Sequence, residues 1–153
     1  MLDGNDYVDV TELRDPALRR LHAEWQQRRN GRAFPARADF DPLEMKYVLG
    51  KMSLIDVRRH PLRFFFRVHA GKAVERLGFD LTGKYLEAYP DAKHRDLLRD
   101  HLIRVVAEGV PVVVRRNAQV TDNHLLQCEG LVLPLAKDGQ SIDMLMTGLS
   151  WYE

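Results

Sequence analysis

Histidines, one cysteine and a few carboxylates are the side chains of this chain that could do chemistry at neutral pH. The histidines are His22, His60, His69, His94, His101 and His124. None of them lies in the short spacing of a zinc motif, and no His-Glu-x-x-His pattern occurs. We therefore predict no metal site. His101 stands among leucines at helical spacing, where a histidine is more often a hydrogen-bonded core residue than a ligand.

Two pairings of a carboxylate with a histidine could support proton abstraction. Asp56 with His69 would need both side chains to point inward. Asp100 and His101 are adjacent, and adjacent residues of a helix do not face the same way. Such chemistry would fit a small cone-shaped α+β enzyme that acts on a small molecule by acid/base catalysis. No Gly-x-Ser-x-Gly, Walker or Gly-x-Gly-x-x-Gly pattern offers another reaction.

Composition restricts the class of protein. The chain has 153 residues, 45% hydrophobic and 29% charged, with a net charge of +1 and one cysteine, as in one globular domain. This balance argues against a nucleic-acid partner, because binding many phosphates needs a basic excess. No run approaches the roughly 20 apolar residues of a membrane span, and the first residues lack signal-peptide features. We expect a cytoplasmic protein without a membrane or nucleic-acid partner.

The elements that position these side chains follow from hydrophobic periodicity. Asp15-Pro16 predicts the start of a helix that stops at Asn30-Gly31, and a second helix is predicted over His94–Glu108. Residues 71–92 show only short helical pieces. Strands are predicted over residues 52–57, 64–68, 112–120, 125–135 and 142–151, with turns at His60-Pro61, Asp122-Asn123 and Lys137-Asp138-Gly139.

This order of elements predicts an α+β fold. An antiparallel five-stranded sheet can pair its strands locally, while helices on one face cover its apolar side. We divide the chain into an N-terminal helical extension, residues 1–34, and a main domain, residues 35–153.

Four segments, taken together and in this order, carry a resemblance to a known family. They are Pro35-Ala36-Arg37-Ala38-Asp39-Phe40-Asp41-Pro42, Leu54-Ile55-Asp56-Val57, Phe64-Phe65-Phe66-Arg67-Val68 and Gly78-Phe79-Asp80-Leu81-Thr82-Gly83-Lys84. Over about residues 15–151 the sequence resembles compact single-domain bacterial PAS proteins, formerly a domain of unknown function. The resemblance implies a PAS-like fold with an internal cavity, and a non-enzymatic sensory or interaction module that signals through a partner protein.

A pocket between the curved sheet and the broken helices is the best candidate site. Alternation along the expected elements selects eight of its candidate lining residues: Phe66, Val68, Leu77, Tyr85, Tyr89, Leu102, Val132 and Met146. Three polar candidates are added for their chemistry: His69, His101 and Arg115. Arg67, His69, Arg76 and Arg115 are candidate anion anchors, since a guanidinium grips a carboxylate with two hydrogen bonds. In the alternative reading, the apolar residues simply fill the core and the arginines face water.

The resemblance leaves the cofactor open. Haem-binding PAS sensors use a histidine on the helix before the third strand, which is the place of His94 and His101 here. Flavin light sensors carry a reactive cysteine in a helical Asn-Cys-Arg-Phe-Leu motif, and Cys128, in an expected strand, departs from it. We expect no such photochemistry, and we expect Cys128 to pack as a small apolar group.

The first predicted helix has a narrow apolar stripe made of Leu18, Leu21 and Trp25. Helices that extend from PAS domains commonly mediate dimers in the proteins that this chain resembles, and aromatic anchors are enriched at interface centres. We therefore predict a homodimer through this stripe. The alternative is that the stripe packs on the chain's own sheet.

Overall fold

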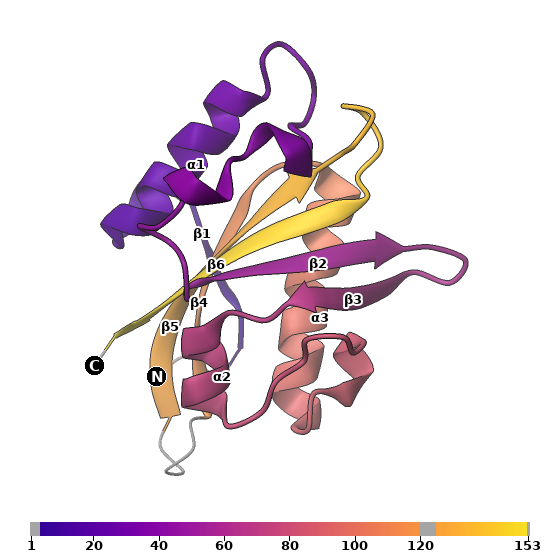
Figure 1. Cartoon of the computed structure of the whole chain (residues 1–153). Helices are drawn as coiled ribbons and strands as arrows, with labels where there is room; N and C mark the ends of the chain where they lie inside the picture. Colours follow the sequence, from indigo (N-terminus) through magenta and orange to yellow (C-terminus); the bar gives the residue numbers. More distant parts are fainter. Residues whose placement is uncertain (1–3, 120–124, 153) are drawn as a thin grey trace.

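An antiparallel sheet forms the centre of the protein (Figure 1). The computed structural model describes residues 4–119 and 125–152. Its six strands lie in the order β1-β4-β5-β6-β2-β3. They are β1 (Asp6–Val8), β2 (Met52–Arg58), β3 (Arg63–Val68), β4 (Val112–Gln119), β5 (Leu125–Leu135) and β6 (Met144–Tyr152). The predicted α+β class and PAS-like sheet are confirmed.

The helices are α1 (Pro16–Arg28), α2 (Gly71–Leu77) and α3 (Ala92–Glu108), with short 3-10 turns η1 (Val10–Glu12), η2 (Arg37–Asp39), η3 (Pro42–Glu44) and η4 (Leu86–Ala88). Two of the helices lie close to their predicted bounds: α1 begins at the predicted Pro16, and α3 ends at the predicted Glu108 but begins two residues before the predicted His94. The carboxylate of Asp15 caps α1 by accepting from the Ala17 N–H. Gly109, with φ of +67°, ends α3 in the left-handed conformation that glycine adopts without strain. Among the described residues, no helix combines the length and hydropathy that crossing a bilayer requires.

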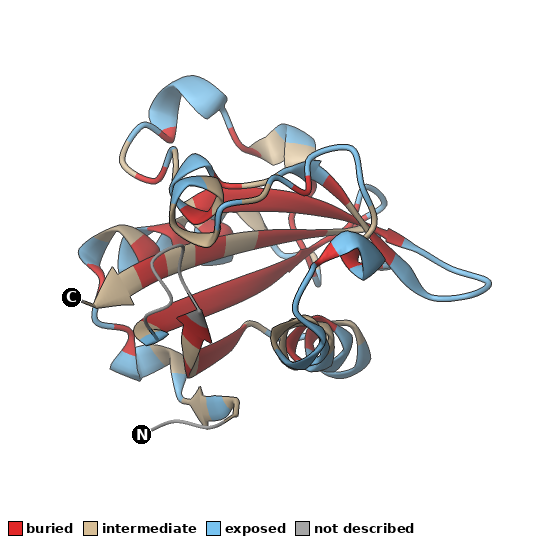
Figure 2. Cartoon of the chain, turned by 90° about the horizontal axis from the view of Figure 1, so that it is seen from below, coloured by how far each residue is buried: buried red, intermediate tan, exposed pale blue. Residues whose placement is uncertain are grey.

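Helices cover both faces of the sheet. The chain's α2 and α3 lie on one face, and Figure 2 shows buried residues along the strands, with α3 seen end-on beside them. The other face carries α1, whose Trp25 Nε1 donates to the Pro134 carbonyl of β5 at 2.8 Å. The α1 face also places Leu18 directly against Gly148 of β6, where an added Cβ would overlap it. The sheet is therefore the middle of three layers.

Alternation along each strand decides which side chain meets which layer. On β6, Thr147, Leu149 and Trp151 face α2 and α3. Met146 and Gly148 point the opposite way, toward α1. This division determines which residues belong to the candidate site.

The sixth strand was not predicted. We expected five strands and a purely helical extension, whereas Tyr7 and its neighbours form β1 and pair with β4, Tyr7 opposite Val114. A three-residue strand in a polar segment has too few residues to show a period of two. It forms because the segment pairs with the edge of β4. Two predictions lie outside the described residues: the end at Val120 of the strand predicted over residues 112–120, and the turn at Asp122-Asn123.

Candidate functional site

A cavity of about 60 Å³ lies between the sheet and the layer formed by α2 and α3. Several predicted residues line it: Phe66, His69, Leu77, Tyr89, His101 and Val132. Further lining residues carry polar groups and were not among the predicted ones: Ser53, Arg116, Cys128, Thr147 and Trp151. His94, considered above only as a haem ligand, lines the cavity as well. The predicted pocket is thus present, with a more polar lining than expected.

Arg116 is the charged group of the cavity. It comes from β4, is only 9% exposed, and pairs across the ladder with Cys128 of β5. Its Nη1 donates to the Asn5 side-chain oxygen at 3.4 Å, a long hydrogen bond. A guanidinium stays protonated when buried, so Arg116 brings a permanent positive charge to the site.

His101 is fully buried on α3, and its ring is neutral. Its Nε2 lies 3.0 Å from the Val112 carbonyl, which can only accept, so Nε2 carries the proton. Burial, with the nearby charge of Arg116, lowers the pKa of His101 to about 3. His101 is therefore a hydrogen-bonded core residue in the wall of the cavity. Because its Nε2 donates to the Val112 carbonyl, that nitrogen is not available to ligate haem iron.

His69 follows β3 and presents one ring nitrogen to the backbone. Its Nδ1 accepts from the Leu81 N–H at 3.0 Å, so in the neutral ring the proton is on Nε2. Burial lowers the pKa of His69, and the carboxylate of Asp80 opposes that shift only in part. His69 is consequently a neutral side chain with a donor N–H at its other edge.

Burial also keeps two further groups of the lining protonated. It raises the pKa of the Tyr89 hydroxyl to about 12 and raises the pKa of the Cys128 thiol, which the charge of Arg116 partly offsets. A protonated buried thiol is a poor nucleophile. Cys128 thus packs as the small side chain that the sequence analysis expected.

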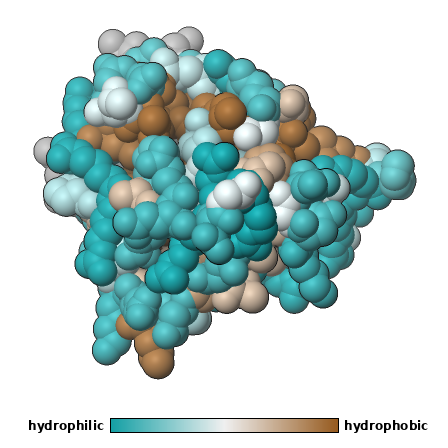
Figure 3. Space-filling model, turned by 90° about the horizontal axis from the view of Figure 1, so that it is seen from above, coloured by the Kyte–Doolittle hydropathy of each residue, from teal (hydrophilic) through white to brown (hydrophobic). Residues whose placement is uncertain are grey.

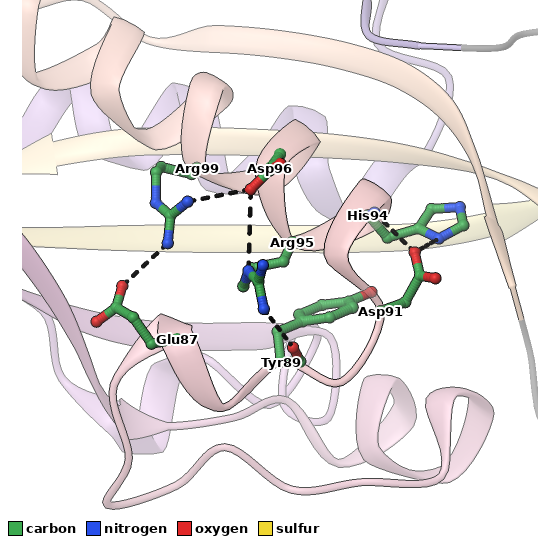
Figure 4. A network of polar contacts seen from close by, with 7 residues as sticks. All are labelled: Glu87, Tyr89, Asp91, His94, Arg95, Asp96 and Arg99. Atoms are coloured by element: carbon green, nitrogen blue, oxygen red, sulfur yellow. Dashed lines mark hydrogen bonds and ion pairs between the residues drawn. The ribbon is translucent and has the colours of Figure 1, made fainter.

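A polar network holds the wall that contains Tyr89 and His94 (Figure 4). Arg99 of α3 donates to Glu87 of η4 and to Asp96, at 3.1 Å in each case. The Asp91 carboxylate caps α3 by accepting from the His94 backbone N–H at 2.8 Å, and it also contacts the His94 ring. These contacts tie η4 and the residues after it to the first turns of α3.

A surface depression of about 330 Å³ adjoins this wall. Leu77, Tyr89 and His94 line both the depression and the cavity. These three side chains therefore lie between the cavity and the surface depression.

Two predicted lining residues lie on the wrong face of the sheet. Met146 is fully buried beneath α1, because the neighbouring Thr147 takes the position toward the cavity. Arg115 likewise points away from Arg116 and donates to the Glu12 carbonyl at 2.7 Å. A strand has a period of two, so an error of one residue moves a side chain to the opposite face.

Three other predicted residues lie outside the cavity lining. Val68 is 45% exposed, since a register shift at Leu54/Ile55 ends the alternation of β3. Tyr85 packs on Phe65 and accepts from Arg58 at 2.7 Å. Leu102 is fully buried in the core and is not among the residues that line the cavity. Of the other candidate anion anchors, Arg67 bonds Asp56 at 2.7 Å and Arg76 lies on α2 outside the lining.

The stripe of α1 packs inside the chain. Leu18 and Leu21 are fully buried and Trp25 is 3% exposed, all against the sheet. The structure thus places these residues as in the alternative reading, on the chain's own sheet.

The face seen from above is mainly hydrophilic, with hydrophobic residues in separate patches (Figure 3).

Neither predicted acid/base pair is assembled. Asp56 binds Arg67, whereas His69 lines the cavity. Asp100 is exposed while His101 is buried. The carboxylate that does approach His69 is that of Asp80, 3.9 Å from Nδ1, and this nitrogen already accepts a backbone hydrogen bond. Within residues 4–119 and 125–152, no group of three histidine, cysteine or acidic residues is placed to hold a metal ion.

The comparisons with known proteins agree with this architecture. The PAS domain family matches residues 13–150, which span α1, the helices around the cavity and nearly all of the sheet. Among curated proteins, none matches the sequence. Because the match covers most of the chain, the protein belongs to the PAS domain family.

Proposed function

We propose that this protein is a PAS sensory or interaction module that binds a small ligand in its cavity and signals through a partner protein. The observation that supports the proposal is the cavity itself, in which a few polar groups are set among apolar side chains. Binding sites for small molecules have this composition. The buried free thiol of Cys128 fits the reducing cytoplasm, where we place the protein.

The N-terminal segment gives the cavity a connection to the surface. Asn5 donates to the Leu97 carbonyl of α3 at 2.8 Å and accepts from Arg116 of β4. Tyr7 meets the His101 ring edge-on, with 6.2 Å between ring centroids. This segment continues through η1 into α1. A ligand that moves Arg116 would therefore alter an element that a partner protein can contact.

We keep a homodimer as part of the proposal. Its contact must use surface residues, because Leu18, Leu21 and Trp25 are already buried within one chain. Light scattering over a range of concentrations tests this part, and we expect the mass of two chains. One-chain mass at every concentration would contradict it.

Native mass spectrometry of the full chain tests ligand binding. The variant for comparison is Gly130→Ala, which should occupy part of the cavity. Its Cβ would lie 3.7 Å from Leu149 and 3.8 Å from His101, so it would overlap neither side chain. We expect a bound small molecule, or thermal stabilisation by members of a small-molecule library, in the wild type and not in the variant. If the wild type carries no ligand and no library member stabilises it, the proposal is wrong.

A further inference from the structure

The charge of the cavity is unbalanced. Arg116 contributes one positive charge, and no Asp or Glu of the described part of the chain lines the cavity. The charge acts within the site, since Arg116 adds to the lowering of the His101 pKa by burial and partly offsets the rise that burial causes in the Cys128 pKa. A cation in such surroundings is stabilised by an anion.

The residues that line the cavity also carry hydrogen-bond donors, one of which has no described acceptor. Trp151 Nε1 is buried and has no hydrogen-bond partner among the described residues. His69 presents the N–H of Nε2, since its Nδ1 accepts from Leu81. Ser53 Oγ accepts from the Ala70 N–H at 2.8 Å, which leaves its own proton to donate. An unmade hydrogen bond of a buried donor costs free energy, which an accepting ligand would recover.

The rest of the lining is apolar and the space is small. Ile55, Phe66, Leu77, Leu98 and Val132 are among the residues that line it. The volume of the cavity is about 60 Å³, several times the roughly 10 to 15 Å³ that is needed to hold one water molecule. The cavity thus suits a ligand of several non-hydrogen atoms with an apolar body.

We infer that the cavity binds a short-chain monocarboxylate, whose carboxylate contacts the Arg116 guanidinium and Trp151 Nε1 while its hydrocarbon body lies among the apolar side chains. This inference rests on the proposed function and specifies its ligand. One buried cation favours a single negative charge, because a phosphate dianion or a dicarboxylate would leave a charge uncompensated. Chloride would match the charge but would leave the apolar part of the cavity unfilled.

The two tryptophans provide a site-specific reading of binding. Their indole N–H groups differ in place, since Trp25 Nε1 donates to the Pro134 carbonyl on the far face, whereas Trp151, whose buried Nε1 has no described partner, is one of the residues that line the cavity. We would titrate the full chain with butyrate and, separately, with butyramide, which has the same number of non-hydrogen atoms and no charge. In NMR spectra we expect butyrate to shift the Trp151 indole signal and not that of Trp25. The affinity for butyramide should be lower by at least about tenfold, as expected when a charge-assisted hydrogen bond is lost.

Two variants assign the contacts. Arg116→Met should remove the preference for butyrate over butyramide, and Arg116→Lys should retain part of it, because the charge remains without the planar fork. Trp151→Phe keeps the aromatic ring and removes the donor, and we expect a several-fold weaker affinity for butyrate. Arg20→Met is the matched control, since it removes an exposed guanidinium from α1 and should change neither affinity.

The outcomes separate this inference from the proposed function. Equal binding of butyrate and butyramide, or a preference that persists in Arg116→Met, overturns the carboxylate assignment and leaves a ligand cavity in place. Saturation of the Trp151 signal by chloride alone, with no further change on adding butyrate, also overturns it. If Arg116→Met does not fold, the butyrate-to-butyramide ratio of the wild type and of Arg116→Lys still decides. A cavity that takes neither probe and carries no cellular ligand refutes both proposals.

Discussion

The two faces of one sheet are filled differently. Toward α1, the side chain of Leu18 occupies the place where Gly148 lacks a Cβ. Toward α3, a Cβ added at Gly130 would meet its neighbours only at ordinary contact distances, and a cavity of about 60 Å³ remains. The α1 face is packed as densely as a protein interior, whereas the α3 face gives up packing energy to keep a space.

The polar groups of the two faces differ in the same sense. On the α1 face, Glu129 is fully buried and accepts from the Arg14 and Asp15 N–H groups, and Asp15 pairs with Lys51 at 2.7 Å. On the α3 face, Arg116 and Trp151 line the same cavity, and Trp151 Nε1 has no described partner. The paired groups stabilise the docking of α1, although Arg115 Nε on that face also has no described partner. At the cavity, a donor without an acceptor is what a binding site offers to a ligand.

Truncation of Leu18 should show the largest difference between the faces. Leu18→Ala removes a fully buried side chain from a dense contact, and we expect a loss of about 3 kcal/mol in the free energy of unfolding. Leu98→Ala, at the wall of the cavity, is half-buried already and should cost about 1 kcal/mol. Urea denaturation measures both. Equal losses would mean that the two faces are packed alike.

Gly148→Ala tests the close approach of α1 to β6. The added Cβ overlaps the end of the Leu18 side chain, and we expect a destabilisation of about 2 kcal/mol. In the double variant Leu18→Ala/Gly148→Ala, the new methyl group enters the space that Leu18 vacates. The double variant should therefore be more stable than the sum of the single losses predicts, in a double-mutant cycle. Strict additivity would contradict this contact.

Lowering the pH should weaken the cavity face before the α1 face. Burial depresses the pKa of His101 to about 3 against 6.5 when unfolded, so its contribution is complete above pH 6.5 and is lost as the pH falls. The loss approaches about 1.4 kcal/mol per pH unit below 6.5. Asp15 also has a lowered pKa, since its hydrogen bonds to Lys51, Ser150 and the Ala17 N–H outweigh burial, but its contribution is lost only below its usual value of 3.8.

His101→Gln separates this effect from that of other histidines. Burial also lowers the pKa of His22 and of His69, so the wild-type slope contains their share. The glutamine amide can donate to the Val112 carbonyl without titrating. Unfolding free energies between pH 5 and pH 7 should therefore depend less on pH in the variant. An unchanged slope would show that His101 does not carry the effect.

Gly130→Ala should have the smallest effect on stability. Its Cβ would enter the cavity at van der Waals distance from Leu149, His101 and Val114, and alanine restricts the unfolded chain. We expect a gain of about 0.5 kcal/mol, opposite in sign to Gly148→Ala on the neighbouring strand. A thermal melt compares the two variants directly. A destabilised Gly130→Ala would mean that the cavity has no space for a methyl group.

The sequence was sufficient for the elements that have strong local signals. Asp15-Pro16 and Gly109 mark the ends of α1 and α3, and β5 matches its predicted residues 125–135. These signals are local because a cap, a positive φ or a run of apolar residues acts within a few residues. By contrast, β1 forms only because β4 offers an edge to pair with.

The site was predicted in part. Phe66 and Val132 lie on strands whose alternation is clear, and both line the cavity. On β4, the run Val112-Val113-Val114-Arg115-Arg116 gives the same residue types to both faces, so it could not show which arginine points inward. Register decides this, since Arg116 pairs with Cys128 on the cavity side.

The sequence by itself determined an α+β chain with a helix near its N-terminus, because periodicity and caps are properties of neighbouring residues, and four segments in order carried its resemblance to PAS proteins. Only the tertiary structure decided that the stripe of α1 closes on its own sheet and that Arg116, rather than Arg115, enters the cavity. Both outcomes depend on which face of the sheet a side chain meets, and strand pairing fixes that face over distances along the chain that no local pattern spans.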